Sequence, residues 1–202
     1  LPTLAIILVL ICSCVPASAG GVRCPLELDG TSSRYDLKGH LEVYEDKTGA
    51  ASIDSVQSEE FDPTDKAVPN FGFTESAYWI KFSVENATSE AQSLVLQITN
   101  PYLDFIYFFV KSDRDSTIER YPAGTRVSLD DKVAWRLSPV QRLVFAPGEA
   151  KTIFIRAKSG TPLRIPLILS TEDGYRHDQL KRYALLGIFY GVLGFLIIYN
   201  IF

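Results

Sequence analysis

Residues 78–85 read Tyr-Trp-Ile-Lys-Phe-Ser-Val-Glu, and residues 93–99 read Ser-Leu-Val-Leu-Gln-Ile-Thr. In both stretches every second side chain is apolar, and most of the side chains between them are polar. Successive side chains point to opposite faces of a strand, so this period of two predicts strands with one buried face. If Ile80 and Phe82 face the core, Trp79 and Lys81 project from the opposite face of the sheet.

Further short stretches with β-branched and aromatic residues follow, separated by turns that contain Gly, Pro and Asp. No long amphipathic helix pattern lies among them. This pattern predicts an all-β protein, folded as an antiparallel β-sandwich. The additional strands are expected at residues 41–45, 102–111, 117–121, 141–145, 152–158 and 163–170.

The chain ends in an uncharged apolar run over residues 183–202. Twenty residues of helix are about 30 Å long, which matches the hydrocarbon core of a bilayer. We therefore expect a transmembrane α-helix here, preceded by a juxtamembrane linker or short helix at residues 171–182. Gly187 and Gly191 have the spacing that lets membrane helices approach closely, so we expect them to pack within a helix bundle.

A second apolar run lies at residues 4–11 and is followed by Ala17-Ser18-Ala19, which fits the rule for signal-peptidase cleavage. We interpret residues 1–19 as a signal peptide and residues 20–40 as a lead-in to the sandwich of residues 41–170. An alternative is a lipidation signal that would acylate Cys14. An uncleaved anchor is disfavoured because the run is too short to span a bilayer.

Composition narrows the function of the exported part. All 24 acidic and 20 basic residues lie between residues 20 and 182, and the net charge is −4. A nucleic-acid binder would need a basic face, so we expect no nucleic-acid partner. Only His40 and His177 are present, which disfavours a histidine-based triad or zinc site, and no acid lies in a recognisable catalytic motif. We expect this segment to have no catalytic residues.

Several motifs resemble one family of bacterial receptors. Residues 70–82 (NFGFTESAYWIKF) resemble the signature of the second type of extracellular domain in seven-transmembrane receptors with diverse intracellular signalling modules. Residues 41–46, 144–149 and 152–156 resemble further parts of that domain in order, and residues 185–191 resemble the first helix of the membrane bundle. The resemblance covers nearly all of the chain after the signal peptide.

The resemblance implies a jelly-roll sensor domain similar to carbohydrate-binding modules, located in the periplasm and anchored in the inner membrane. It also implies six further receptor helices and a cytoplasmic signalling module such as a histidine kinase or diguanylate cyclase. The implied ligand is a carbohydrate or another small periplasmic molecule. Two alternatives remain: a protein-interaction module, for example one that forms a homodimer, and a carbohydrate-binding module on a single membrane anchor.

Sugar recognition combines an aromatic face with planar hydrogen-bonding groups. Trp79 with Lys81 is therefore the first candidate ligand site, and Trp135 with Arg136 is the second, with Arg142 nearby in sequence. The competing interpretation is that each Trp packs under a loop or against the second sheet. Asp62 and Asp65 are weaker candidates for a calcium site, because carboxylates suit this ion, and a solvated acidic loop is the alternative. We expect no other cofactor.

Overall fold

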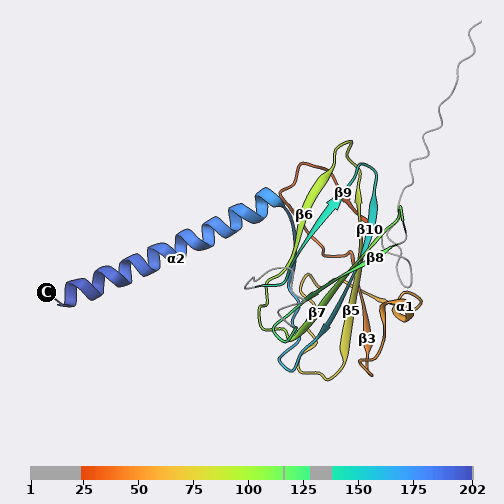
Figure 1. Cartoon of the computed structure of the whole chain (residues 1–202), viewed down its shortest axis with the longest axis horizontal. Coiled ribbons are helices and arrows are strands. Elements are labelled where there is room, and N and C mark those ends of the chain that lie inside the picture. The colour runs from red at the N-terminus through yellow and green to blue at the C-terminus, as the bar shows by residue number, and fades with distance from the viewer. Residues whose placement is uncertain (1–23, 116, 128–137, 202) are drawn as a thin grey trace, which may run out of the picture.

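The computed structural model describes residues 24–115, 117–127 and 138–201. Two β-sheets pack face to face, and a long helix, α2 (Glu172–Ile201), leaves the sandwich and runs away from it (Figure 1). The signal peptide expected at residues 1–19 lies outside the described residues, as do Trp135 and Arg136.

The larger sheet, sheet A, has the strand order β4-β3-β5-β10-β7-β8, with β1 beside β5. Sheet B has the order β2-β11-β6-β9. The bounds in sheet A are β1 (Leu26–Leu28), β3 (Leu41–Asp46), β4 (Asp62–Thr64), β5 (Ala77–Asn86), β7 (Phe105–Ser112), β8 (Ile118–Ala123) and β10 (Ala150–Lys158). The bounds in sheet B are β2 (Arg34–Tyr35), β6 (Gln92–Ile98), β9 (Val140–Phe145) and β11 (Leu167–Thr171).

The chain crosses between the sheets after β1, β2, β5, β6, β8, β9 and β10, as in a jelly roll. The all-β sandwich expected from the sequence is therefore confirmed. One difference is β1, which pairs with β5 in parallel, whereas all other described strand pairs are antiparallel.

The core between the sheets is formed by the apolar positions of the alternating stretches. Ile80 and Phe82 of β5 are buried against Leu94 and Leu96 of β6, in one cluster that extends through both sheets. Full burial of one such side chain stabilises the fold by about 1.5–3 kcal/mol. The alternation in the sequence thus identified the buried face of both strands correctly.

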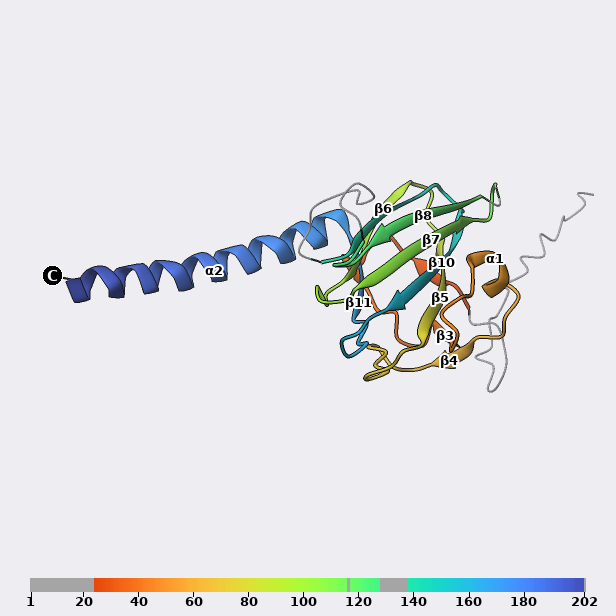
Figure 2. The same cartoon turned by 60° about the horizontal axis from the view of Figure 1, so that its bottom comes forward.

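A second apolar layer lies on the outer face of sheet A. Residues 47–61 leave β3, form the short helix α1 (Ile53–Val56) and cross this face, on the side of the sandwich away from α2 (Figure 2). Val56 and Phe61 of this segment are buried against Trp79, together with Phe109 and Phe154 of sheet A. We call residues 47–61 the covering segment. The sequence did not predict α1, since four residues are too few for a helical period.

Asp46, the last residue of β3, anchors the start of the covering segment. Its buried carboxylate accepts hydrogen bonds from the hydroxyl of Thr48 at 2.8 Å, the amide of Gly49 at 2.8 Å and the amide of Ala51 at 2.9 Å. Burial alone raises the pKa of Asp46, but these hydrogen bonds outweigh it and hold the pKa below its ordinary value. The ionised carboxylate is therefore part of the folded turn.

We expect Asp46→Asn to lower the free energy of unfolding by about 1.5 kcal/mol at neutral pH, because the NH₂ group of the new side chain would face backbone or hydroxyl donors that now bind the carboxylate. A depressed pKa contributes stability that is present above the unfolded pKa and is lost as the pH falls through the folded pKa. The wild type should therefore lose more stability than Asp46→Asn between about pH 5 and pH 2. Urea unfolding across this range, with the exposed Asp62→Asn as control, measures it; equal acid dependence in both variants would contradict it.

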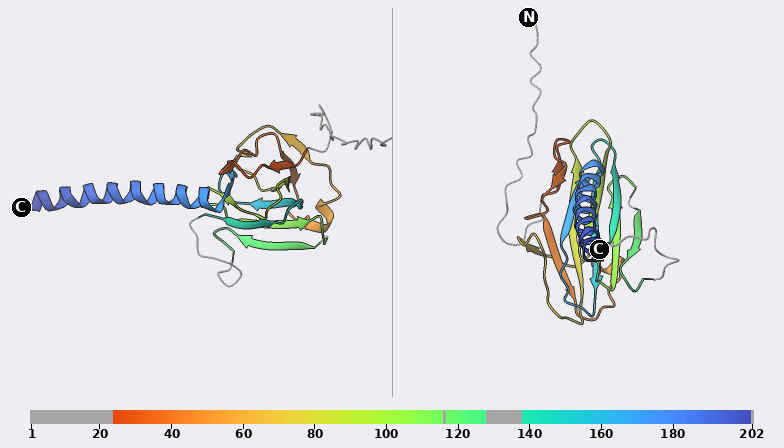
Figure 3. Two further views of the ribbon diagram at one scale, coloured as in Figure 1. Left: turned by 90° about the horizontal axis from the view of Figure 1, so that it is seen from above. Right: turned by 90° about the vertical axis from the view of Figure 1, so that its left-hand side faces the viewer.

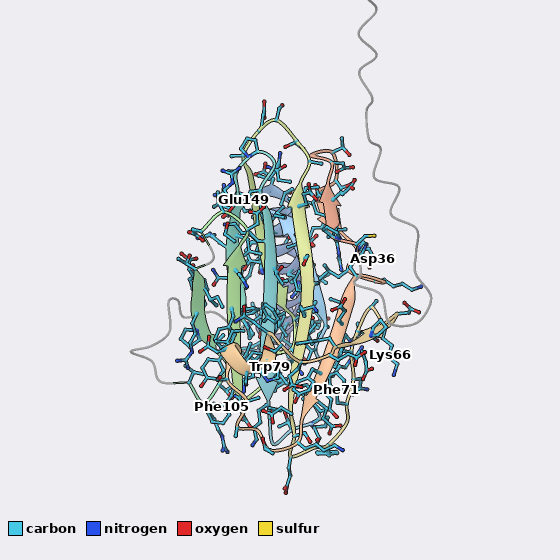
Figure 4. All side chains as sticks on the ribbon, turned by 90° about the vertical axis from the view of Figure 1, so that its right-hand side faces the viewer. Asp36, Lys66, Phe71, Trp79, Phe105 and Glu149 are labelled. Atoms are coloured by element: carbon cyan, nitrogen blue, oxygen red, sulfur yellow. The ribbon has the colours of Figure 1, made fainter. Side chains whose placement is uncertain are left out.

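The end of the sandwich at which β5 finishes is closed by hydrogen bonds around Asn86. This side chain is fully buried: its amide donates to the carbonyl oxygens of Glu90 at 2.8 Å and Ala146 at 3.0 Å. Its oxygen accepts from the amide and the hydroxyl of Thr88. The carboxylate of Glu149, labelled at this end in Figure 4, accepts from the amide of Ala146 at 2.7 Å. Polar groups here are satisfied within the fold.

Helix α2 unites two segments that the sequence had separated. The linker or short helix expected at residues 171–182 and the membrane helix expected from residue 183 form one continuous helix of 30 residues, which begins at Glu172 after the end of β11. It is long and apolar enough to cross a membrane. Thirty residues give about 45 Å, more than a bilayer core requires, so the polar residues 172–182 lie outside the apolar span.

Candidate functional site

Trp79, the first sequence candidate, lies on the outer face of sheet A as expected, but it is not open to solvent. Figure 4 looks onto this face and labels Trp79 in its lower half. The exposed fraction of the side chain is 0%, because Val56 and Phe61 of the covering segment pack against it. Trp79 stacks on Phe109, with ring centroids 5.5 Å apart. The expected open aromatic face is therefore corrected: in this structure Trp79 packs under a loop.

Lys81 is engaged within the same layer. Its ammonium forms a salt bridge with Glu42 of β3 and lies 4.6 Å from the ring centroid of Phe61. Lys81 thus joins two neighbouring strands to the covering segment. In this arrangement it stabilises the layer that hides Trp79.

A row of cations and aromatic rings accompanies Trp79 and was not recognised in the sequence. Arg156 of β10 pairs in register with Trp79 on one side and with Tyr107 on the other, and its guanidinium lies 6.0 Å from both ring centroids. Arg120 of β8 lies 4.5 Å from the ring centroid of Tyr107. Arg156 also donates to the carbonyl oxygen of Gly49 at 2.7 Å and so holds the covering segment. Only the strand register reveals this row.

Arg142 belongs to a different part of the molecule. It lies on β9 of sheet B, where its guanidinium forms a salt bridge of 2.9 Å with Glu172 in the first turn of α2. The structure therefore does not bring Arg142 together with Trp79 and Lys81. It places Arg142 at the junction between the sandwich and the helix. Trp135 and Arg136 lie outside the described residues, so their role stays a prediction.

The junction itself has no linker, since β11 ends at Thr171 and α2 begins at Glu172. Thr171 donates its amide to the carbonyl oxygen of Ser33 at 3.0 Å, and Gly174 donates its amide to the hydroxyl of Thr171 at 3.1 Å. Gly174 approaches Ser33 so closely that a Cβ atom at this position would overlap the carbonyl oxygen of Ser33. The first turn of α2 is thus clamped to the segment before β2 and, through Glu172, to β9.

We expect Gly174→Ala to lower the free energy of unfolding of the sandwich by about 2 kcal/mol, because the added methyl group must displace the helix or the Ser33 segment. This sign is unusual, since alanine normally stabilises a helix relative to glycine. Gly187→Ala is the matched control, because nothing lies within 4 Å of its Cβ position. Thermal unfolding in lipid nanodiscs should show a melting temperature lower by roughly 6 °C for Gly174→Ala alone; equal melting of the two variants would refute the clamp.

The other candidates gain little from the structure. Asp62 is an exposed residue of the edge strand β4, and Asp65 is exposed just after it. Across the described ranges, no three His, Cys, Asp or Glu side chains gather as a metal site. Gly187 and Gly191 face open space on α2. The calcium site and the helix-packing role therefore remain sequence predictions.

Two aromatic side chains that the sequence analysis passed over are the most exposed of the large apolar residues in the described sandwich. Phe73 is 81% exposed and Tyr102 is 72% exposed. Both lie at the end of the sandwich opposite Asn86, in loops 70–76 and 99–104, which contact the segment 159–166. Phe73 follows Gly72 outside any alternating stretch, and Tyr102 follows Pro101 at the very start of the strand expected at residues 102–111, so strand periodicity could not mark either ring as exposed.

A β-sandwich that continues without a linker into a helix long and apolar enough to cross a membrane is the arrangement typical of a membrane-anchored domain. Residues 38–171 match the family model described as 7TMR-DISM extracellular 2, and the chain belongs to this family. It therefore combines an extracellular sensor domain with a candidate membrane helix.

Solved structures with a similar fold include carbohydrate-binding modules. One is TmCBM61 in complex with β-1,4-galactotriose, with 12% identity, a TM-score of 0.36, and coverage of 70% of this chain and 99% of that chain. Another comes from a study of the promiscuous specificity of carbohydrate-binding modules of the β-sandwich superfamily, with 6% identity, a TM-score of 0.30, and coverage of 66% and 56%. A third is the family GH115 glucuronidase BtGH115A, with 11% identity, a TM-score of 0.32, and coverage of 68% and 17%. No curated protein matches the chain.

Proposed function

We propose that this chain is the periplasmic ligand-sensing input of a bacterial receptor in the inner membrane, and that occupancy of the sandwich is passed to the membrane through α2. The ligand is a carbohydrate or another small molecule of the cell envelope. The remaining receptor helices and a cytoplasmic module receive the signal. In this proposal the segment itself performs no catalysis.

The observation that supports transmission best is the clamped junction between β11 and α2. Ligand binding acts on a receptor only if it shifts an equilibrium of the attached element. A flexible linker would let the sandwich move without moving the helix, whereas Thr171, Gly174 and the Arg142–Glu172 ion pair tie the first turn of α2 to sheet B. A change in the packing of sheet B therefore changes the direction of the helix.

The test uses the chain in lipid nanodiscs with fractionated soluble envelope material, namely muropeptides, periplasmic glucans and divalent cations. Thermal unfolding identifies a ligand, and hydrogen exchange at the amides of Thr171 and Gly174 reports on the junction. We expect a ligand that raises the melting temperature also to change exchange at these amides. A ligand that stabilises the sandwich with no effect at the junction would contradict transmission.

The same experiment separates the proposal from a protein-interaction module. If no fraction alters the melting temperature while the chain forms a concentration-dependent dimer, the sandwich is an interaction domain instead. Orientation is tested independently with a reporter fused after Arg182. The reporter is one that is active only in the cytoplasm. If the fusion is active, the sandwich lies on the cytoplasmic side of the membrane and is not a periplasmic sensor.

A further inference from the structure

The end of the sandwich opposite Asn86 presents two aromatic rings to solvent. Phe73 and Tyr102 are 81% and 72% exposed, while the next large apolar side chain exposed on the described sandwich, Val144, is 59% exposed and lies on β9. An aromatic ring that stays in water does not contribute the favourable free energy that its burial would give. Two such rings at one end of a fold indicate a surface that is completed by a partner.

Both rings are carried by loops that are fastened to the same segment. Leu163 donates its amide to the carbonyl oxygen of Gly72 at 2.7 Å, and so fixes the residue before Phe73. On the other side of this segment, the hydroxyl of Thr161 donates to the carbonyl oxygen of Tyr102 at 3.4 Å. Phe73 and Tyr102 thus flank residues 161–163. Because their backbones are held in advance, binding between them costs little ordering entropy.

Polar side chains are carried by the loops at the same end as the rings, on residues 70 and 164, which form a β-bridge. Arg164 is exposed and pairs with no carboxylate among the described residues, and its carbonyl oxygen accepts from the side-chain Nδ2 of Asn100 at 3.0 Å. Asn70 is exposed, and its side-chain oxygen accepts from the amide of Gly72 at 3.2 Å, which leaves its NH₂ group as a donor. The surface therefore combines two aromatic faces with a guanidinium and an amide. We call Phe73, Tyr102, Arg164 and Asn70 the loop-end site.

The chemistry of the loop-end site selects among partners. A purely apolar partner would cover Arg164 and Asn70 without satisfying their donors, which costs free energy. A nucleic acid would need a basic surface, and the chain carries a net charge of −4. A pyranose ring has an apolar C–H face and equatorial hydroxyl groups that accept and donate hydrogen bonds, so it matches both kinds of group.

The position of this end also suits an extended glycan. The right-hand view of Figure 3 looks along α2 and shows the strands running across the helix axis, so both loop ends of the sandwich point to the side. Figure 4 labels Phe71, two residues before Phe73, in the lower part of the sandwich, away from Glu149. A ligand at this end approaches parallel to the membrane surface and does not meet the bilayer.

We propose that the loop-end site binds a pyranose unit of a glycan between Phe73 and Tyr102, with Arg164 and Asn70 hydrogen-bonded to its hydroxyl groups. This inference rests on the proposed sensing function and names its ligand class and its site. The proposed site is therefore an open loop end of the sandwich, and not the outer face of sheet A, where Trp79 is buried.

The test is saturation-transfer NMR and calorimetry on the chain in nanodiscs, with chitotriose, cellotriose and maltotriose as the probes. We expect at least one trisaccharide to bind with a dissociation constant of about 1 mM or lower. Tyr102→Ala and Phe73→Ala should each weaken it at least about tenfold, which corresponds to the loss of one ring contact. Val144→Ala is the matched control, because it removes an exposed apolar side chain elsewhere, and its affinity should equal that of the wild type.

Three outcomes overturn the inference. Absence of binding by all three probes at about 10 mM overturns the pyranose assignment. Binding that both aromatic variants leave unchanged overturns the location, and a dimer that Tyr102→Ala dissolves assigns the surface to a second copy of the chain. Failure of the proposed function looks different: a trisaccharide then binds at the loop end, but exchange at the amides of Thr171 and Gly174 does not change.

Discussion

Trp79→Ala is expected to lower the free energy of unfolding by about 4 kcal/mol, because it leaves a large cavity under the covering segment. The ring is fully buried and contacts side chains from both sheet A and residues 47–61. In a sandwich of this size the melting temperature should fall by roughly 12 °C. Thermal unfolding of the chain in nanodiscs, followed by far-UV circular dichroism, measures the change. A loss below about 1 kcal/mol would show that the cavity collapses or that the segment packs loosely.

Trp79→Phe is the informative control for this prediction. The indole Nε1 is buried and has no hydrogen-bond partner among the described residues, so the wild type already carries the cost of an unsatisfied donor. Phenylalanine removes that donor and keeps most of the ring, and we expect a loss of only about 1 kcal/mol. Because Trp79→Ala acts on folding, a loss of ligand binding in that variant would not by itself locate a site. The exposed Tyr102 and Phe73 are better positions for that purpose.

Asn86→Ala should have the second largest effect, a loss of about 3 kcal/mol. The substitution deprives the carbonyl oxygens of Glu90 and Ala146 of a donor and the amide and hydroxyl of Thr88 of an acceptor, around a side chain that is itself fully buried. Buried polar groups left without partners cost about 1–3 kcal/mol each, partly offset by relaxation of the loop. The same unfolding measurement applies, and the melting temperature should fall by roughly 9 °C.

Asn86→Asp distinguishes hydrogen bonding from packing at this position, because the side chain keeps its size. At neutral pH a carboxylate would face two carbonyl oxygens, so we expect a loss at least as large as that of Asn86→Ala. Protonation restores one donor, and the burial of the group raises its pKa, so the stability of Asn86→Asp should recover as the pH falls from about 7 to about 5. A pH-independent loss would indicate that the volume of the side chain matters and its hydrogen bonds do not.

The strands and the core between the sheets were predictable because their signal is local. Alternation along residues 78–85 and 93–99 determines which side chains face inward, and β5 and β6 follow that assignment. A helix able to cross a membrane was predictable for the same reason, since its apolar run is continuous in the chain. The sequence left open whether the polar residues before it form a short helix or a linker, because a polar composition does not distinguish the two; in the structure residues 172–182 are helical.

The environment of Trp79 was not predictable, because it depends on residues far away in the sequence. Alternation placed Trp79 on the outer face, but Val56 and Phe61, which cover it, lie in a stretch with no regular period. The neighbouring Arg156 depends on the pairing of β5 with β10, a register that no local pattern specifies. The partner of Arg142, Glu172, likewise follows from the position of α2 against sheet B.

The continuity of α2 with β11 has a geometric consequence for the orientation of the sandwich. An α-helix turns by 100° per residue, so the eleven residues from Glu172 to Arg182 set the angle at which the sandwich faces around the axis of the membrane helix. Insertion of two residues into this stretch would rotate the sandwich about the helix axis by about 200° and lengthen the helix by only about 3 Å. Insertion of seven residues would return the sandwich almost to its original orientation. The length of residues 172–182 therefore determines the rotational orientation of the sandwich about the helix axis as well as its distance from the apolar part of α2.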